Sequence, residues 1–156
     1  MINNFRGEYA FLSNFYSCHI PIVCFDETII CQSLEHAFQA NKTFDPIKRK
    51  QIATASSPSE AKKLGKNVQL RPDWEKNKVE IMERLINKKF SFVPLREKLL
   101  ATGNEELVEG NTWHDNFWGD CYCPKCKNIK GQNHLGKLLM KKRKEIQEID
   151  KIYNNF

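Results

Sequence analysis

The hydrophobic and polar positions of this chain divide into two short apolar stretches followed by a series of helical patterns. Residues 18–24 and 28–32 are rich in isoleucine, valine and cysteine, and Phe25-Asp26-Glu27 separates them. Two such stretches joined by a short turn predict a β-hairpin. From Ser33 onward the apolar positions recur every three to four residues, which predicts helices.

The first predicted helix begins at Ser33, which has the side chain of an N-cap, and it buries an apolar stripe of Leu34, Ala37 and Phe38. The remaining elements are expected in this order: a helix over 46–55, a helix capped by Ser57 and ending at Gly65, a long helix from 72 to about 90, a helix over 94–101, a short strand over 107–109, a long loop over 111–129, and a terminal helix over 135–149. The pattern therefore predicts an α+β fold, mainly helical with a small β-sheet.

Composition agrees with a single domain over 1–156. Hydrophobic residues make up 40% and charged residues 28% of the 156 residues, as in ordinary globular proteins. We find no apolar run long enough to cross a membrane and no signal peptide, so we expect a cytoplasmic protein with no membrane partner. The net charge of +6 is concentrated in residues 121–144, which hold eight lysines or arginines and no acidic residue. This segment is either a surface for phosphates or a solvated helix face.

The first helix carries a second, polar stripe beside its apolar one. Glu35, Gln39 and Lys42 lie at positions i, i+4 and i+7, which share one helix face. At the edge of a core, a lysine can lose part of its hydration and become nucleophilic, and a glutamate can be tuned for proton transfer. The alternative is an ordinary surface ion pair.

Two further clusters carry chemistry. The predicted loop over 111–129 places Trp113 and Trp118 on either side of Asp115, a composition suited to stacking a base and binding a ribose, although either tryptophan can equally fill a core. Cys123 and Cys126 have zinc-knuckle spacing, and Cys121 with His114 or His134 can complete four ligands. Reduced cysteines without metal are the expectation and zinc is the alternative, so we expect no cofactor.

Six segments, in order over about residues 5–143, resemble the NADAR (YbiA-like) N-glycosidase family. They are GEYAFLSNFY at 7–16, LEHAFQANK at 34–42, SPSEAKKLG at 57–65 with Trp74 following, Thr102-Gly103 with Leu107-Val108-Glu109, Trp113 with Trp118-Gly119, and GQNHLG at 131–136. The resemblance implies the NADAR fold and an enzyme that cleaves the bond between a phosphorylated ribose and a nitrogenous base. The implied substrates are ADP-ribose on guanine, free or in DNA or RNA, and a ribosylaminopyrimidine phosphate of riboflavin biosynthesis.

Family members are thought to use a lysine of this first helix, and Lys42 stands at that place. The resemblance thus implies that Lys42 forms a Schiff base with the sugar and that Glu35 transfers protons. Direct attack by water, with Glu35 or Glu109 as general base and Lys42 as a charge clamp, stays open. The predicted substrate-binding residues are Asn14, Gln39, Lys62, Arg71, Trp74, Glu109, Asp115, Trp118 and Asn133.

Two other classes of function compete with an enzyme. A non-catalytic module that binds ADP-ribose or modified nucleic acid would use the aromatic residues and the basic segment, but it has no need of Glu35 and Lys42 together. A zinc-dependent nucleic-acid-binding module would rest on the short cysteine cluster alone. The sequence leaves open the physiological base and the oligomeric state.

Overall fold

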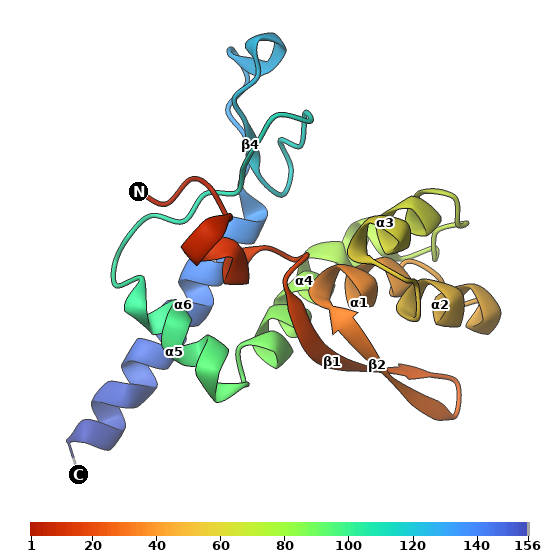
Figure 1. Ribbon diagram of the computed structural model, residues 1–156, viewed down its shortest axis with the longest axis horizontal. Coiled ribbons are helices and arrows are strands. Elements are labelled where there is room, and N and C mark those ends of the chain that lie inside the picture. Colours follow the sequence, from red (N-terminus) through yellow and green to blue (C-terminus); the bar gives the residue numbers. More distant parts are fainter. Residues whose placement is uncertain (156) are drawn as a thin grey trace. The chain divides into compact units, whose positions relative to one another are not determined.

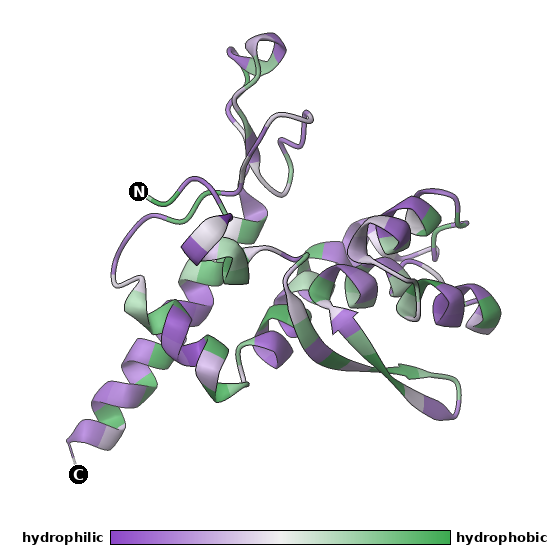
Figure 2. Ribbon diagram, viewed as in Figure 1, coloured by the Kyte–Doolittle hydropathy of each residue, from purple (hydrophilic) through white to green (hydrophobic). Residues whose placement is uncertain are grey.

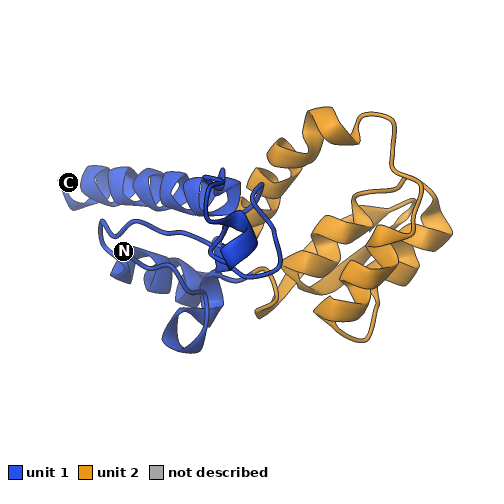
Figure 3. Ribbon diagram, turned by 90° about the horizontal axis from the view of Figure 1, so that it is seen from above, with its two compact units in different colours: residues 1–13, 90–156 blue, residues 14–89 orange. Residues whose placement is uncertain are grey.

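The computed structural model describes residues 1–155 and divides the chain into two compact units. Unit 1 contains Met1–Ser13 and the chain from Phe90 onward, and unit 2 is the single continuous segment Asn14–Lys89 (Figure 3). Each unit is described by itself.

Unit 2 begins with the predicted hairpin. Strands β1 (Ser17–Cys24) and β2 (Glu27–Ser33) pair antiparallel, with Cys24 opposite Glu27 and Ser17 opposite Ser33. Alternate residues of β1 are buried from Ile20 to Cys24, as expected for a hairpin with one face on a core. The tight turn at 25–26 requires a positive φ of 61° at Phe25.

Four helices follow in unit 2: α1 (Leu34–Ala40), α2 (Pro46–Ala53), α3 (Pro58–Lys66) and α4 (Trp74–Lys89). The side chains of Ser33, Asp45 and Ser57 cap the first three by accepting backbone hydrogen bonds, which confirms the predicted caps at Ser33 and Ser57. Helix α1 contacts both strands and the other three helices, and every one of its residues is buried (Figure 1). The polar residues Glu35 and Gln39 of α1 are therefore buried inside unit 2.

Helix α1 is shorter than the sequence pattern predicts, and this corrects the placement of Lys42. The helix ends at Ala40 because the side chain of Asn41 donates to the Ala37 carbonyl at 2.7 Å and caps the last turn. The Lys42 N–H then bonds the Gln39 carbonyl at 3.1 Å in a tighter turn. Lys42 thus lies just beyond the helix and not on its surface.

Unit 1 contains η1 (Gly7–Leu12), α5 (Val93–Ala101), β3 (Gly110–Asn111), β4 (Asp120–Cys121), η2 (Pro124–Cys126) and α6 (His134–Asn154). The predicted strand over 107–109 is wrong: Leu107 makes one bridge to Ile2, and the strand proper begins at Gly110. The predicted loop over 111–129 is also wrong in part, because β3 pairs in parallel with β4 inside it. The paired residues are ten positions apart in the sequence, as Gly110 and Asp120 are, and a local pattern does not predict such pairing.

The terminal helix is the longest element of unit 1 and is amphipathic along its length (Figure 2). It buries Leu135, Leu138, Leu139 and Ile146, and the buried guanidinium of Arg143 donates to the Thr102 hydroxyl at 2.9 Å. The mainly helical α+β class with small sheets is confirmed. Among residues 1–155, no helix has the length and apolar composition needed to span a bilayer.

Candidate functional site

Glu35 is the most deeply buried carboxylate candidate in unit 2. It occupies the first turn of α1, with 7% of its surface exposed. The Gln39 amide donates to Glu35 Oε1 at 2.8 Å, and the Glu35 N–H donates to the Asn14 carbonyl at 2.9 Å. Burial raises the pKa of Glu35, and the Gln39 hydrogen bond and the charges of Lys62 and Lys42 oppose that rise. The neutral form of Glu35 is therefore more favoured at this position than it is for a glutamate in water.

Lys42 experiences the opposite shift. Burial lowers the pKa of Lys42, the attraction of Glu35 opposes this, and the nearby cations Lys62 and Lys66 lower it further. The Lys42 ammonium lies 5.9 Å from the centre of the Trp74 ring, which contributes to the burial. The Arg71 N–H donates to the Lys42 carbonyl at 2.7 Å and fixes the backbone at this point.

Burial thus moves the pKa of Glu35 up and the pKa of Lys42 down, so both values lie nearer to neutral pH than in water. Such a pair can supply a proton donor and a nucleophile at one place. The charges of Glu35 and Lys42 act on each other: Lys42 lowers the pKa of Glu35, and Glu35 raises the pKa of Lys42.

Two buried acceptor atoms near this pair have no hydrogen-bond donor among residues 1–155. They are Asn14 Oδ1 and Gln39 Oε1, in side chains that are 9% and 5% exposed. A buried acceptor without a donor costs about 1–3 kcal/mol, so such atoms call for an explanation. Both atoms are closed to solvent, so a ligand with N–H or O–H groups would reach them only after nearby side chains move.

Helix α3 holds Gln39 in place through Gly65. A Cβ atom added at Gly65 would overlap Gln39 Oε1, so the close approach of α3 to α1 requires glycine at this position. Sequence reasoning took Gly65 as the end of a helix and missed this role. The available signal was a glycine inside an otherwise regular helical segment.

Two of the predicted substrate-binding residues, Lys62 and Arg71, carry positive charge and differ in their surroundings. Lys62 is half-buried on α3 and close enough to Glu35 and Lys42 to affect the pKa of both. Arg71 is already committed within the protein, because its guanidinium binds both oxygens of Asp73 at 2.6 and 2.8 Å and lies 4.1 Å from the Phe44 ring centre. The charge of Lys62 therefore acts on Glu35 and Lys42, whereas the Arg71 guanidinium is held by Asp73.

Trp74 belongs to the core of unit 2. Its side chain is 5% exposed and packs on Phe38, with the ring centres 5.1 Å apart. In this position the indole excludes water from Lys42. Its predicted contact with substrate stays a prediction.

The predicted site residues of unit 1 mainly support their own segment. Asn133 has a φ of 50°, accepts from the Glu109 N–H at 3.0 Å and donates to the Leu107 carbonyl at 2.9 Å. Asp115 Oδ1 accepts from the backbone N–H groups of Phe117 and Trp118 at 3.1 and 2.9 Å. The half-buried Trp118 ring lies edge-on to Phe117, with their centres 4.9 Å apart. Their predicted roles in substrate binding stay predictions.

Comparison with known proteins identifies the family. A sequence profile of the NADAR domain matches residues 3–147, which includes both units. The chain belongs to the NADAR family. It is 39% identical over 115 residues to the N-glycosidase YbiA of Escherichia coli (strain K12), which covers 72% of this chain and 68% of YbiA. The NMR structure of E. coli YbiA superposes with a TM-score of 0.76 over 97% of this chain and 89% of YbiA, at 34% identity.

Other relatives are longer or carry other names. An N-glycosidase of Nostoc punctiforme is 42% identical over 123 residues, which is 75% of each chain. A riboflavin biosynthesis protein of Vibrio vulnificus is 36% identical over 146 residues, and the match covers 90% of this chain but only 36% of that protein. The NADAR domain is thus found both in proteins of similar length and as part of a longer chain.

One buried lysine of this NADAR domain was not anticipated from the sequence. Lys89 is 2% exposed, and burial lowers its pKa to about 8, with the nearby Cys18 opposing the shift. Its ammonium lies 5.8 Å from the centre of the Tyr16 ring. A lysine at the end of a charged helix gives no sequence pattern that distinguishes it from an exposed one.

Proposed function

We propose that this protein is an N-glycosidase that hydrolyses the bond between a phosphorylated ribose and a nitrogenous base. The observation that carries the proposal is the pairing of Glu35, whose pKa burial raises, with Lys42, whose pKa burial lowers. The N-glycosidases of E. coli and N. punctiforme among its relatives support the reaction class.

In the proposed reaction, the free amine of Lys42 attacks the anomeric carbon of the ribose. The electron pair of the C–N bond leaves with the base, and neutral Glu35 supplies the proton that the base requires. The resulting Glu35 carboxylate takes the proton from the alkylated nitrogen. The nitrogen electron pair then forms the C=N bond of a Schiff base as the bond to the ring oxygen breaks, and Glu35 returns the proton to that oxygen. Water then adds to that carbon and expels the amine, which regenerates Lys42.

A direct displacement by water remains the second mechanism. Glu35 would then remove a proton from water, and the Lys42 ammonium would stabilise negative charge on the substrate. The burial of Lys42 favours the covalent route, because it promotes the uncharged amine that a clamp does not need.

The polar atoms of unit 2 favour a base with amino groups. Asn14 Oδ1 and Gln39 Oε1 are acceptors that would become available once neighbouring side chains move, and the exocyclic amines of guanine or of an aminopyrimidine are donors. Lys62 offers a charge for a phosphate. We therefore propose two substrates, ADP-ribose on guanine, free or within DNA or RNA, and a ribosylaminopyrimidine phosphate. Because phosphorylated nucleotides are intracellular, we place the reaction in the cytoplasm.

The test is incubation with each substrate and detection of the released base by mass spectrometry. Borohydride added during turnover should reduce the Schiff base and leave a ribose phosphate on the peptide that contains Lys42. Lys42→Ala should abolish base release and trapping, and Glu35→Gln should slow base release strongly. Lys48→Ala, at an exposed position on α2, is the matched control and should retain both.

Three results would separate the alternatives. Base release by Lys42→Ala at nearly the wild-type rate would overturn the covalent mechanism. Turnover without any trapped adduct would favour direct attack by water. Tight binding of ADP-ribose with no base released from either substrate would identify a binding module and overturn the proposed enzyme.

A further inference from the structure

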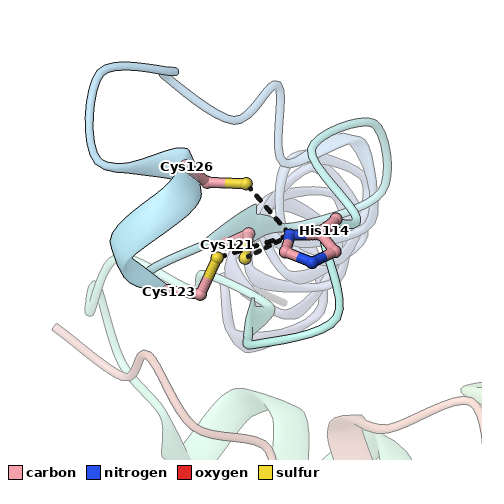
Figure 4. Close-up of side chains that lie close together, drawn as sticks. All are labelled: His114, Cys121, Cys123 and Cys126. Carbon is pink, nitrogen blue, oxygen red and sulfur yellow. Dashed lines mark hydrogen bonds between the residues drawn. The ribbon is translucent and has the colours of Figure 1, made fainter.

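Four metal-ligating side chains of unit 1 converge on one point. The Nδ1 atom of His114 lies 3.3 Å from Cys123 Sγ, 3.3 Å from Cys126 Sγ and 4.0 Å from Cys121 Sγ (Figure 4). All four ligand atoms lie within 4.8 Å of one another. The predicted alternative ligand, His134, instead bonds Gln132 at 2.9 Å and lies against Phe117.

These separations are close to those that a tetrahedral zinc ion imposes on its ligands. Zn–S and Zn–N bonds of about 2.3 and 2.1 Å place neighbouring ligand atoms about 3.6–3.8 Å apart. The three distances from His114 Nδ1, 3.3, 3.3 and 4.0 Å, lie on both sides of that value. Since all four ligand atoms lie within 4.8 Å of one another, movements of no more than about 1 Å would bring them to the separations of a tetrahedral site.

The backbone is arranged to hold this set. Cys121 lies in β4 beside Asn111 of β3, and the η2 turn brings Cys126 back to Cys123 through a 3.0 Å backbone bond. His114 has a φ of 69°, a conformation that is uncommon for residues other than glycine. The four side chains therefore come from three segments of the chain, namely the loop at His114, strand β4 and the η2 turn.

Asn116 supports two of the cysteines from outside the cluster. Its amide donates to Cys126 Sγ at 3.4 Å, and its carbonyl oxygen accepts from the Cys121 N–H at 2.9 Å. Hydrogen bonds to a ligand sulfur orient it and stabilise its thiolate form, as second-shell groups do in metal sites. The exposed Lys125 and Lys127 of the same segment add positive charge near the thiolates.

Hydrophobic packing does not account for the cluster. Cys121 and Cys126 are buried, but Cys123 is only half-buried and His114 is exposed. A core cysteine has no need of an exposed imidazole among three sulfurs.

We propose that His114, Cys121, Cys123 and Cys126 bind a structural Zn²⁺ ion. Binding replaces the three thiol protons with one divalent cation, so the centre carries a net charge of −1. Four protein ligands leave no position for water, and such closed sites are structural. The ion would cross-link the segment that contains Asp115 and Trp118, where short strands and few buried apolar residues otherwise provide little stability.

The test is zinc content of the full-length protein purified under reducing conditions from zinc-supplemented medium. We expect one zinc per chain by plasma mass spectrometry, and loss of that zinc in Cys121→Ser and Cys126→Ser. Cys18→Ser, which changes a cysteine of unit 2, is the matched control and should retain the metal. His114→Cys should also retain it, because four cysteines form an equally good zinc site.

Cobalt provides a readout that does not depend on the variants folding. Wild-type protein loaded with Co²⁺ should show the intense visible bands of a tetrahedral ion and a thiolate-to-cobalt charge-transfer band. Chelation of the zinc should lower the melting temperature of the wild type. A reduced, folded protein with no zinc and no such cobalt spectrum would overturn the proposal. So would a protein in which two of these cysteines form a disulfide under the same conditions.

Discussion

At the scale of single residues, the environment of Lys42 decides whether it can act as a nucleophile. Burial lowers its pKa and the charge of Glu35 raises it, so removal of that charge in Glu35→Gln should lower the pKa of Lys42 further. NMR titration of protein with ¹³C-labelled lysine side chains measures this directly. An ordinary lysine pKa for Lys42 in the wild type, or a rise in Glu35→Gln, would contradict the assignment.

A second residue-scale prediction concerns Gly65. In Gly65→Ala the new methyl group must displace the Gln39 amide, which donates to Glu35 at 2.8 Å. We expect unfolding to become easier by about 1–3 kcal/mol, as for overpacking, and base release to slow by at least about tenfold. Urea denaturation and turnover measure the two effects.

Two variants control the Gly65 experiment. Gly103→Ala, at a φ of 63° with open space around the position, should cost stability without affecting turnover. Gly65→Ala combined with Gln39→Ala should recover stability but not activity, because the space is regained and the hydrogen bond is not. If the double variant regains full activity, Gln39 does not support Glu35.

At the scale of elements, the caps of the helices make unequal contributions to stability. Ser57 Oγ accepts one N–H bond, from Glu60. Ser33 Oγ accepts from the His36 N–H and also lies 2.7 Å from His36 Nδ1, while His36 Nε2 lies 2.9 Å from the Ala55 carbonyl. Since a carbonyl only accepts, Nε2 carries the proton and Ser33 donates to Nδ1.

This arrangement predicts the order of three alanine substitutions. Ser57→Ala should cost about 1 kcal/mol, as for the loss of an N-cap. Ser33→Ala should cost about 1–3 kcal/mol more, because it also leaves a buried imidazole nitrogen unpaired. Ser59→Ala, exposed within α3, should be nearly neutral. Urea denaturation gives the order, and equal costs for Ser33 and Ser57 would show that the imidazole bond contributes nothing.

Local patterns predicted most elements, and contacts across the sequence decided the rest. The hairpin and the caps at Ser33 and Ser57 follow from residues within a few positions of each other. The end of α1 depends on the Asn41 side chain, and the β3–β4 pair on residues ten positions apart, so neither was anticipated. In the candidate site, the placement of Glu35 and Gln39 on one face of α1 was predictable, whereas Lys42 lies beyond the end of the helix. The packing of Gly65 on Gln39 was not, because periodicity gives no information about which helices touch.

At the scale of the whole molecule, the net charge of +6 should assist capture of an anionic substrate. We expect kcat/KM for a phosphorylated substrate to fall as sodium chloride increases, mainly through a higher KM, because salt screens the attraction. Steady-state kinetics at several salt concentrations measures this, with sucrose as a control for viscosity. A kcat/KM independent of salt would mean that the positive charge does not guide the substrate.

The continuity of unit 2 also has a genetic meaning. The chain enters this unit once, at residues 13–14, and leaves it once, at 89–90. One continuous run of codons within the coding sequence therefore specifies Glu35, Gln39, Lys42, Lys62 and Gly65. Recombination with breakpoints at those two places would transfer the amine, its carboxyl partner and their support together, leaving the cysteine cluster behind to be inherited separately.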